Sequence, residues 1–285
     1  MLRKLSVIAA LLGLALASPA LAANTREEPK AVHWSFEGPF GGYDQAQLQR
    51  GYKVYREVCS SCHSMNLIAF RNLGDPGGPF WSPKYPNSNE NPWVKAIAKD
   101  YQVPDIDRDT GDVIKRPATS ADHFPAPFAN EAAARASNGG ALPPDMSLLA
   151  RAREGEAAYI YSIVTGYHMT PPAGLKVPTG KFYNPYLQGD LSSYWKDGKD
   201  PDHVPVGGFI AMPPPLLNAK VTFDDGKPST VSQEAYDVAA FLTWAADPKL
   251  EERKQLGLSV MIFLLLFSGI LFASYRTLWR GIDHG

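Results

Sequence analysis

The chain has 285 residues, 45% of them hydrophobic and 20% charged, and this balance is typical of a globular protein rather than a disordered one. Its 28 basic and 29 acidic residues give a formal net charge of −1, which excludes the strongly basic character of many nucleic-acid-binding proteins. The 25 prolines and 24 glycines favour long ordered loops over a chain dominated by helix.

The N-terminus has the three parts of an export signal. Arg3 and Lys4 precede an apolar run at residues 5–17, and Ala20-Leu21-Ala22 offers the small residues of a cleavage site. A first transmembrane helix is the alternative, but the run is too short and Ser18-Pro19 interrupts it. We therefore expect residues 1–22 to be a signal peptide and the body of the protein to be exported.

The first helix of the body is predicted over residues 44–60. Asp44 is a suitable N-cap, and apolar residues recur at helical spacing from Leu48 to Cys59. This helix leads directly into the two cysteines of the chain.

Those cysteines, Cys59 and Cys62, enclose two serines and are followed at once by His63. A disulfide, a redox dithiol and half of a zinc site are alternatives. Zinc would need further ligands, however, and a thioredoxin-like site would need alternating strands and helices. C-x-x-C-H is the attachment motif of c-type haem, so we expect one covalently bound haem c with His63 as an iron ligand.

Further helices are predicted over residues 91–99, 154–165 and 230–247. At the start of the last one, Thr230 and Gln233 form a capping-box pattern. No block of the sequence is rich in strand patterns. We expect one mainly α domain at residues 23–247, with long loops wrapped around an apolar cofactor.

The C-terminal region contains an uncharged run from Leu256 to Tyr275, which as a helix would span about 30 Å, the hydrocarbon thickness of a bilayer. A buried core helix is the alternative, although such helices rarely avoid polar residues for so long. We expect a linker at residues 248–255, one transmembrane anchor at 256–275 and a cytoplasmic tail at 276–285. The export signal then predicts a single-pass protein of the bacterial inner membrane, with the haem domain in the periplasm.

The second axial ligand of the haem iron remains open at this point. The candidates are Met65, Met146, Met169, Met212, His33, His123, His168 and His203. Met65 is too close to His63 to reach across the haem ring. Met169 and Met212 are each followed closely by prolines, which stiffen a ligand loop, and Met212 precedes the last helix of the domain by about twenty residues.

Several separate motifs make the chain resemble the cytochrome c1 family, the haem subunits of cytochrome bc1 complexes. They are Val58 to Met65, Asn138 to Asp145, Ala150 to Arg153, Tyr159 to Gly166, Tyr183 to Tyr186, Ala211 to Pro215 and Asp224 to Ser229. Their order and the single C-terminal anchor also match.

This resemblance implies a class I cytochrome c-like domain, in which Cys59 and Cys62 hold the haem and His63 and Met212 are the axial ligands. It also implies that Arg153 pairs with a haem propionate. Without the resemblance, the sequence would favour an exposed surface charge at this position. The expected partners are cytochrome b, a Rieske iron–sulfur protein that gives electrons, a soluble or membrane-bound cytochrome c that takes them, and membrane lipid, in a dimeric complex. The chain would be an electron-transfer subunit of quinol:cytochrome c reductase rather than an enzyme alone.

Two departures from the family pattern bear on the site. An extra cysteine pair that braces the ligand loop in some bacterial relatives is missing. Residues 191–206 look like an insertion just before Met212, so the path of that loop is uncertain. Five aspartates between residues 100 and 112 could steer a basic partner, but a solvated loop is the simpler explanation.

Two other functions compete with this one. An anchored cytochrome c that feeds a terminal oxidase would use the same chemistry. A haem peroxidase or gas sensor would instead need an open sixth coordination position.

Overall fold

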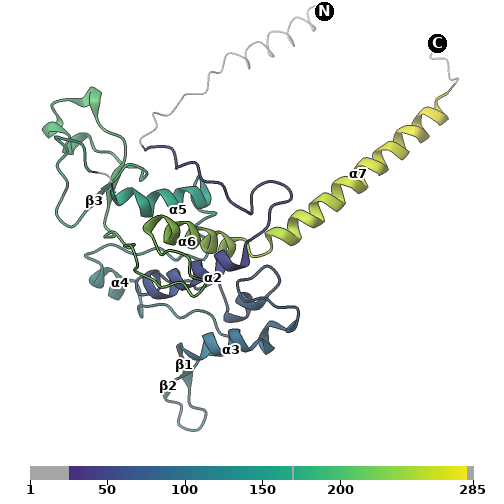
Figure 1. The fold of residues 1–285 in the computed structure, drawn as a ribbon, viewed down its shortest axis with the longest axis horizontal. Helices are drawn as coiled ribbons and strands as arrows, with labels where there is room; N and C mark the ends of the chain where they lie inside the picture. Colours follow the sequence, from purple (N-terminus) through teal and green to yellow (C-terminus); the bar gives the residue numbers. More distant parts are fainter. Residues whose placement is uncertain (1–25, 169, 281–285) are drawn as a thin grey trace, which may run out of the picture.

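The computed structural model describes residues 26–168 and 170–280. The predicted signal peptide, Met169 and the last five residues of the predicted tail therefore lie outside the described residues. Figure 1 shows the helices of the body gathered in one head, from which a single long helix, α7, projects. The prediction of a mainly α fold with one C-terminal apolar helix is confirmed.

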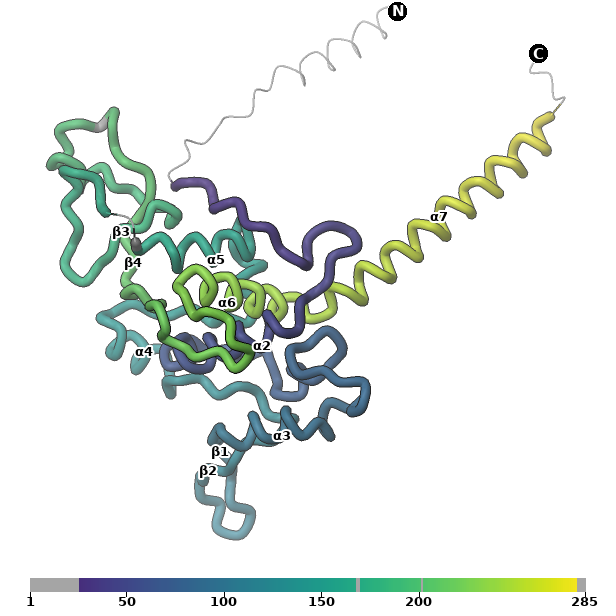
Figure 2. Tube along the Cα trace, viewed as in Figure 1, coloured from purple at the N-terminus to yellow at the C-terminus, as the bar shows by residue number. Residues whose placement is uncertain are grey.

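Two helices far apart in the sequence cross at the centre of the head, α2 (Gln45–Val54) and α6 (Val231–Ala246). Both predicted N-caps are confirmed, because the Asp44 side chain accepts from the Gln47 amide and the Thr230 side chain from the Gln233 amide. Figure 2 shows the two helices side by side, with α5 (Glu156–Thr165) next to α6. Aromatic side chains fill the space around the crossing, among them Tyr52, Tyr55, Phe124 and Phe241.

A buried ion pair ties the two crossing helices together. Arg50 on α2 donates from Nε to Asp237 Oδ2 at 2.8 Å and from Nη2 to Asp237 Oδ1 at 3.1 Å. Its Nη1 donates to Asp225 Oδ2 at 2.6 Å. Burial raises the pKa of Asp237, although the hydrogen bonds from Arg50 act in the opposite direction.

The remaining regular elements are short. The predicted helix at 91–99 is confirmed as α3 (Pro92–Lys99), α5 begins two residues later than predicted, and α4 (Glu131–Ser137) was not predicted. Turns of 3-10 or π helix are Tyr55–Cys59, Phe70–Gly74, Ser88–Glu90, Gly166–His168, Ser192–Tyr194, Lys196–Gly198 and Pro201–His203.

Two small antiparallel sheets complete the head. Strand β1 (Gln102–Ile106) pairs with β2 (Val113–Pro117), so the aspartate-rich segment forms a projecting hairpin. Strand β3 (Phe182–Asn184) pairs with β4 (Gly208–Ile210), which brings together segments on either side of the predicted insertion.

The anchor helix α7 (Leu250–Leu278) begins earlier than predicted. Residues 250–255, expected to be a linker, form its first turns and pack on the head. Leu250 is buried, and the backbone amide of Tyr43 donates to Glu251 Oε1 at 2.7 Å. The transmembrane helix and the head are therefore joined by packed helix rather than by a flexible segment.

Candidate haem site

The C-x-x-C-H motif follows α2 through one turn of π helix, Tyr55–Cys59. The amide of Ser60 donates to the Tyr55 carbonyl at 2.8 Å, and the amides of Cys62 and His63 donate to the Cys59 carbonyl at 3.1 and 2.9 Å. Such π turns recur at functional sites because they change the direction of the side chains that follow. Here the tight turn places the two thiols and the imidazole on one short segment.

Neither thiol is tied up in a disulfide, as attachment to a haem requires. Cys59 and Cys62 are half-buried and are not joined in a disulfide. Burial raises the pKa of the Cys59 thiol to about 12, so in this environment the thiol keeps its proton at neutral pH.

His63 is oriented by a backbone carbonyl distant in sequence. Its Nδ1 lies 2.8 Å from the carbonyl oxygen of Pro144. A carbonyl can only accept, so this contact assigns the proton to Nδ1 and leaves Nε2 with the lone pair that binds a metal. Histidine ligands commonly donate from the second ring nitrogen in this way, which fixes both the tautomer and the ring orientation.

The segment that carries Pro144 is bound closely to the motif. The Met146 amide donates to the Ser64 carbonyl at 2.8 Å, and Asp145 Oδ2 accepts from Ser64 Oγ at 2.7 Å and from the Asn66 amide at 2.9 Å. These contacts cross some 80 residues of sequence. Pro144 and Asp145 thus act on the motif through long-range hydrogen bonds, which a sequence pattern does not reveal.

Met212 lies two residues beyond β4 and is partly buried. The Tyr167 hydroxyl, just beyond α5, donates to the Met212 carbonyl at 2.9 Å. The β3–β4 pairing and this hydrogen bond hold the Met212 loop from two sides, so its path is defined although the bracing cysteine pair of some relatives is missing.

The two ends of the predicted insertion at 191–206 lie close together in space. A Cβ added to Gly189, before the insertion, would lie 2.8 Å from the Cα of Gly208, after it. The inserted segment therefore begins and ends at almost the same point. Between these ends it packs on residues 174–176, where Leu175 and Trp195 form a β-bridge.

The other candidate ligands have different surroundings. Met65 and Met146 are buried in the hydrophobic core. His33, His123 and His203 are on the surface, where they contact Glu37, the Asn66 carbonyl and Asp200. Met169 and the side chain of His168 lie outside the part of the chain that is described.

Arg153 is exposed, and its guanidinium donates to the neighbouring carbonyl of Ala152 at 3.0 Å. Its neighbour Arg151 instead binds Glu156 and Asp247, both at 2.5 Å. The assignment of Arg153 to a haem propionate stays a prediction.

The donor set fits a covalently attached haem: two thiols, an imidazole with Nε2 available, and a thioether on a loop held in place. Within residues 26–168 and 170–280, no group of three or more His, Cys, Asp and Glu side chains is placed to hold a metal ion.

Comparison with known proteins agrees with this site. Residues 34–282 match the model of the Cytochrome C1 family. Cytochrome c1 of Rhodospirillum rubrum is 41% identical, with 92% of this chain and 93% of the relative covered. The mitochondrial cytochrome c1 heme protein of Saccharomyces cerevisiae is also 41% identical, with 88% and 72% covered. Cytochrome b/c1 of Bradyrhizobium diazoefficiens is 40% identical over 89% of this chain, which spans only 36% of that longer protein. The chain therefore belongs to the cytochrome c1 family.

Proposed function

We propose that this chain accepts single electrons from a Rieske iron–sulfur protein and passes them to a soluble or membrane-bound cytochrome c. Its family membership makes it a haem-containing electron-transport subunit of a cytochrome bc1 complex. In such a subunit the protein positions and tunes the cofactor rather than making or breaking bonds itself.

In the proposed site, Cys59 and Cys62 hold one haem c through two thioether bonds, and His63 and Met212 are the axial ligands. The haem supplies the one-electron couple of its iron. The observation that carries this proposal is the hydrogen bond from His63 Nδ1 to Pro144, because it presents Nε2 beside two unpaired thiols. Arg153 would neutralise a haem propionate with its planar fork of donors.

Buried aromatic residues give one side of this site an apolar, packed setting. Tyr55, Phe124 and Phe241 are buried beside the motif, and the ring of Tyr55 is in contact with the other two. The Tyr55 hydroxyl also donates to the His63 carbonyl at 3.3 Å. A fixed environment suits electron transfer, because little has to rearrange when the charge of the site changes.

We further propose that the head is periplasmic, that α7 crosses the inner membrane beside cytochrome b and lipid, and that the complex is dimeric. The support for this topology is the export signal together with the 29-residue helix α7, whose apolar stretch is long enough to cross a membrane and is exposed.

Haem extraction tests the proposed attachment. After denaturation and acid–acetone treatment, the full chain should keep its haem, and titration should find no reactive thiol. Free extraction of haem, or two titratable thiols in haem-loaded protein, would contradict the proposal. A peroxidase or gas sensor would differ in another way, since its reduced haem would bind carbon monoxide without any mutation.

A further inference from the structure

A tight loop at residues 36–42, here called the foot loop, packs against the first turns of α7. Lys254 Nζ donates to the carbonyls of Phe36 at 2.7 Å and Gly41 at 3.0 Å. The loop closes on itself so tightly that a Cβ on Gly41 would lie 2.0 Å from the Glu37 carbonyl oxygen. The foot loop is therefore held at a fixed position along the helix.

Phe40 projects from this loop into solvent. With 82% of its surface exposed, it is the most exposed large apolar residue in the described part of the chain. Burial of a phenylalanine side chain away from water is favourable. Because the loop is pinned, Phe40 has no route into the core, and only a partner outside the head can provide this gain.

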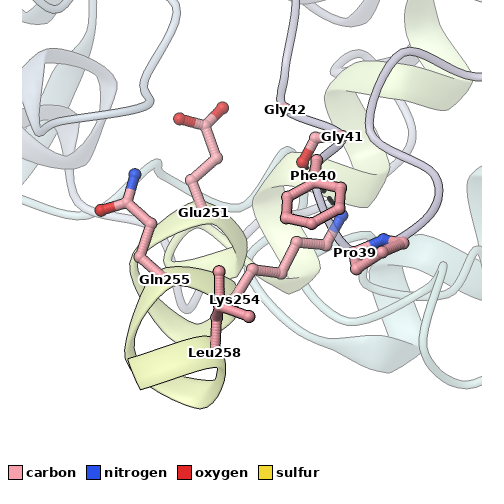
Figure 3. A pocket seen from close by; sticks show the side chains of 8 residues that line it. All are labelled: Pro39, Phe40, Gly41, Gly42, Glu251, Lys254, Gln255 and Leu258. Carbon is pink, nitrogen blue, oxygen red and sulfur yellow. Dashed lines mark hydrogen bonds between the residues drawn. The ribbon is translucent and has the colours of Figure 1, made fainter. Parts of the chain in front are cut away.

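The position of Phe40 along α7 indicates what that partner is. Figure 3 shows the Lys254 side chain extending from α7 to the foot loop, beside Phe40. Both residues line a pocket of about 230 Å³, as do Gln255 and Leu258. Leu258 is the third residue of the uncharged run that starts at Leu256, so it lies only about 3 Å beyond the start of that run. Phe40 thus stands at the level where α7 passes from polar to apolar surroundings.

We propose that the foot loop rests on the membrane and that Phe40, held there by Lys254, inserts into the interfacial layer of the bilayer, with lipid filling the cavity beside α7. Phenylalanine is among the apolar side chains that interfacial segments bury at the boundary of headgroups and acyl chains, and the apolar surface of Phe40 continues the exposed apolar surface of α7. The proposal rests on α7 spanning the membrane. With α7 it gives the head two points of attachment, which fix its tilt and hence the height of the haem site.

Spin labelling of the full-length, haem-loaded chain in phosphatidylcholine vesicles tests this. Haem attachment consumes both native thiols, so Phe40→Cys offers one site for a nitroxide label. Val113→Cys, on the hairpin and 78% exposed, is the aqueous control, and Leu265→Cys, in the middle of α7, is the membrane control. Power saturation compares access of oxygen, which partitions into the bilayer, with access of a water-soluble nickel chelate.

The expected ratio of oxygen to nickel access at position 40 lies between the two controls and is several-fold above that at position 113. Equal ratios at 40 and 113, with a membrane value at 265, would overturn the foot loop proposal and leave the topology intact. An aqueous value at 265 would overturn the proposed topology and this inference with it. Protection of position 40 only in the assembled, detergent-solubilised complex would identify a protein partner instead of lipid.

The role of Lys254 has its own test. In the Phe40→Cys background, Lys254→Met removes both hydrogen bonds to the loop and keeps a similar side-chain length. The label should become more mobile, and its oxygen-to-nickel ratio should fall toward the aqueous control. An unchanged spectrum and ratio would show that Lys254 does not hold Phe40 in place.

Discussion

Gly51 on α2 lies directly against the backbone of Asp237 on α6. A Cβ at position 51 would be 2.1 Å from the Asp237 carbonyl oxygen and 2.6 Å from the Cβ of Phe241. No other residue type could allow the two helices to approach so closely. This contact sets the crossing that carries the haem motif at the end of α2.

Gly51→Ala should therefore destabilise the head by about 1–3 kcal/mol or more, the range typical of overpacking. The free energy of unfolding in denaturant, measured on the haem-loaded full chain in detergent, checks this. Gly257→Ala is the matched control, because a Cβ there meets nothing within 4 Å and alanine favours the helix. Equal stability of the two variants would show that the close approach is absent.

The Arg50–Asp237 pair should contribute far more to stability than a surface pair on the same helix. Asp237→Asn leaves Arg50 buried without its full charge partner, and breaking a buried pair costs about 3–5 kcal/mol. Lys53→Met removes the bond to Asp224, whose side chain is 88% exposed, and should cost less than about 1 kcal/mol. Denaturant midpoints of both variants give the comparison, and similar losses would contradict it.

The β1–β2 hairpin should loosen in acid. The hydrogen bonds from Arg116 hold the pKa of Asp122 well below its usual range of about 4. Such a carboxylate has a lower pKa in the folded protein than in the unfolded one. It stabilises the fold fully above the unfolded-state pKa, and this stabilisation is lost as the pH falls below that value. We expect the amide hydrogens of residues 102–122 to exchange faster in acid than at pH 7, once the rates are corrected for intrinsic exchange. This increase should begin only below about pH 4.

Asp122→Asn should weaken this pH dependence, leaving the part that Asp105 contributes through its own hydrogen bond from Arg116, and should raise exchange already at pH 7. Asp109→Asn, at the exposed end of the hairpin, is the control and should leave the dependence unchanged. An Asp122→Asn protein with wild-type exchange at both pH values would show that Arg116 does not tie the hairpin to the head through Asp122.

Sequence patterns predicted those parts of the fold that depend on neighbouring residues. The starts of α2 and α6 follow from Asp44 and Thr230, whose capping geometry is local. Residues 250–255 were predicted to be a linker, and in the structure they form the first turns of α7. Glu251 and Lys254 in fact bind backbone atoms of residues 36–43, and such contacts leave no periodic pattern.

At the candidate site, too, local features could be predicted from the sequence and long-range contacts could not. C-x-x-C-H is a contiguous motif, so Cys59, Cys62 and His63 could be proposed as haem-binding residues from residue types alone. The hydrogen bond to His63 comes from the Pro144 carbonyl, which every residue type carries and no composition can indicate. Met212 could be selected among the methionines only with the help of family resemblance, because its support from Tyr167 and β3 is long-range.

The packed start of α7 predicts where the anchor can be removed. A chain ending after Gln255 keeps Leu250 and the contacts of Glu251 and Lys254, and should appear as a soluble, haem-bearing periplasmic domain. A chain ending after Lys249 loses these contacts and should be less stable, with a lower denaturant midpoint. Membrane fractionation and haem staining check both. Retention of the longer truncation in the membrane would mean that the N-terminal segment is an uncleaved anchor.

Met212 gives the sharpest distinction between an electron carrier and a ligand-binding haem protein. Met212→Leu keeps a similar apolar volume and removes the sulfur. A thioether is a neutral, soft ligand that favours ferrous iron, so its loss should lower the reduction potential by about 100 mV or more, equivalent to about 2.3 kcal/mol per electron. The reduced variant should also bind carbon monoxide and stall quinol oxidation in the complex.

Redox titration and carbon monoxide difference spectra measure both effects. Met146→Leu, in the hydrophobic core, is the control and should keep the wild-type potential because it changes packing alone. Met169→Leu should behave in the same way. If Met169→Leu abolished the spectrum of methionine ligation while Met212→Leu preserved it, the axial ligand would be misassigned. The hydrogen bond from Tyr167 to the Met212 carbonyl and the β3–β4 pairing would then hold a loop that does not bind iron.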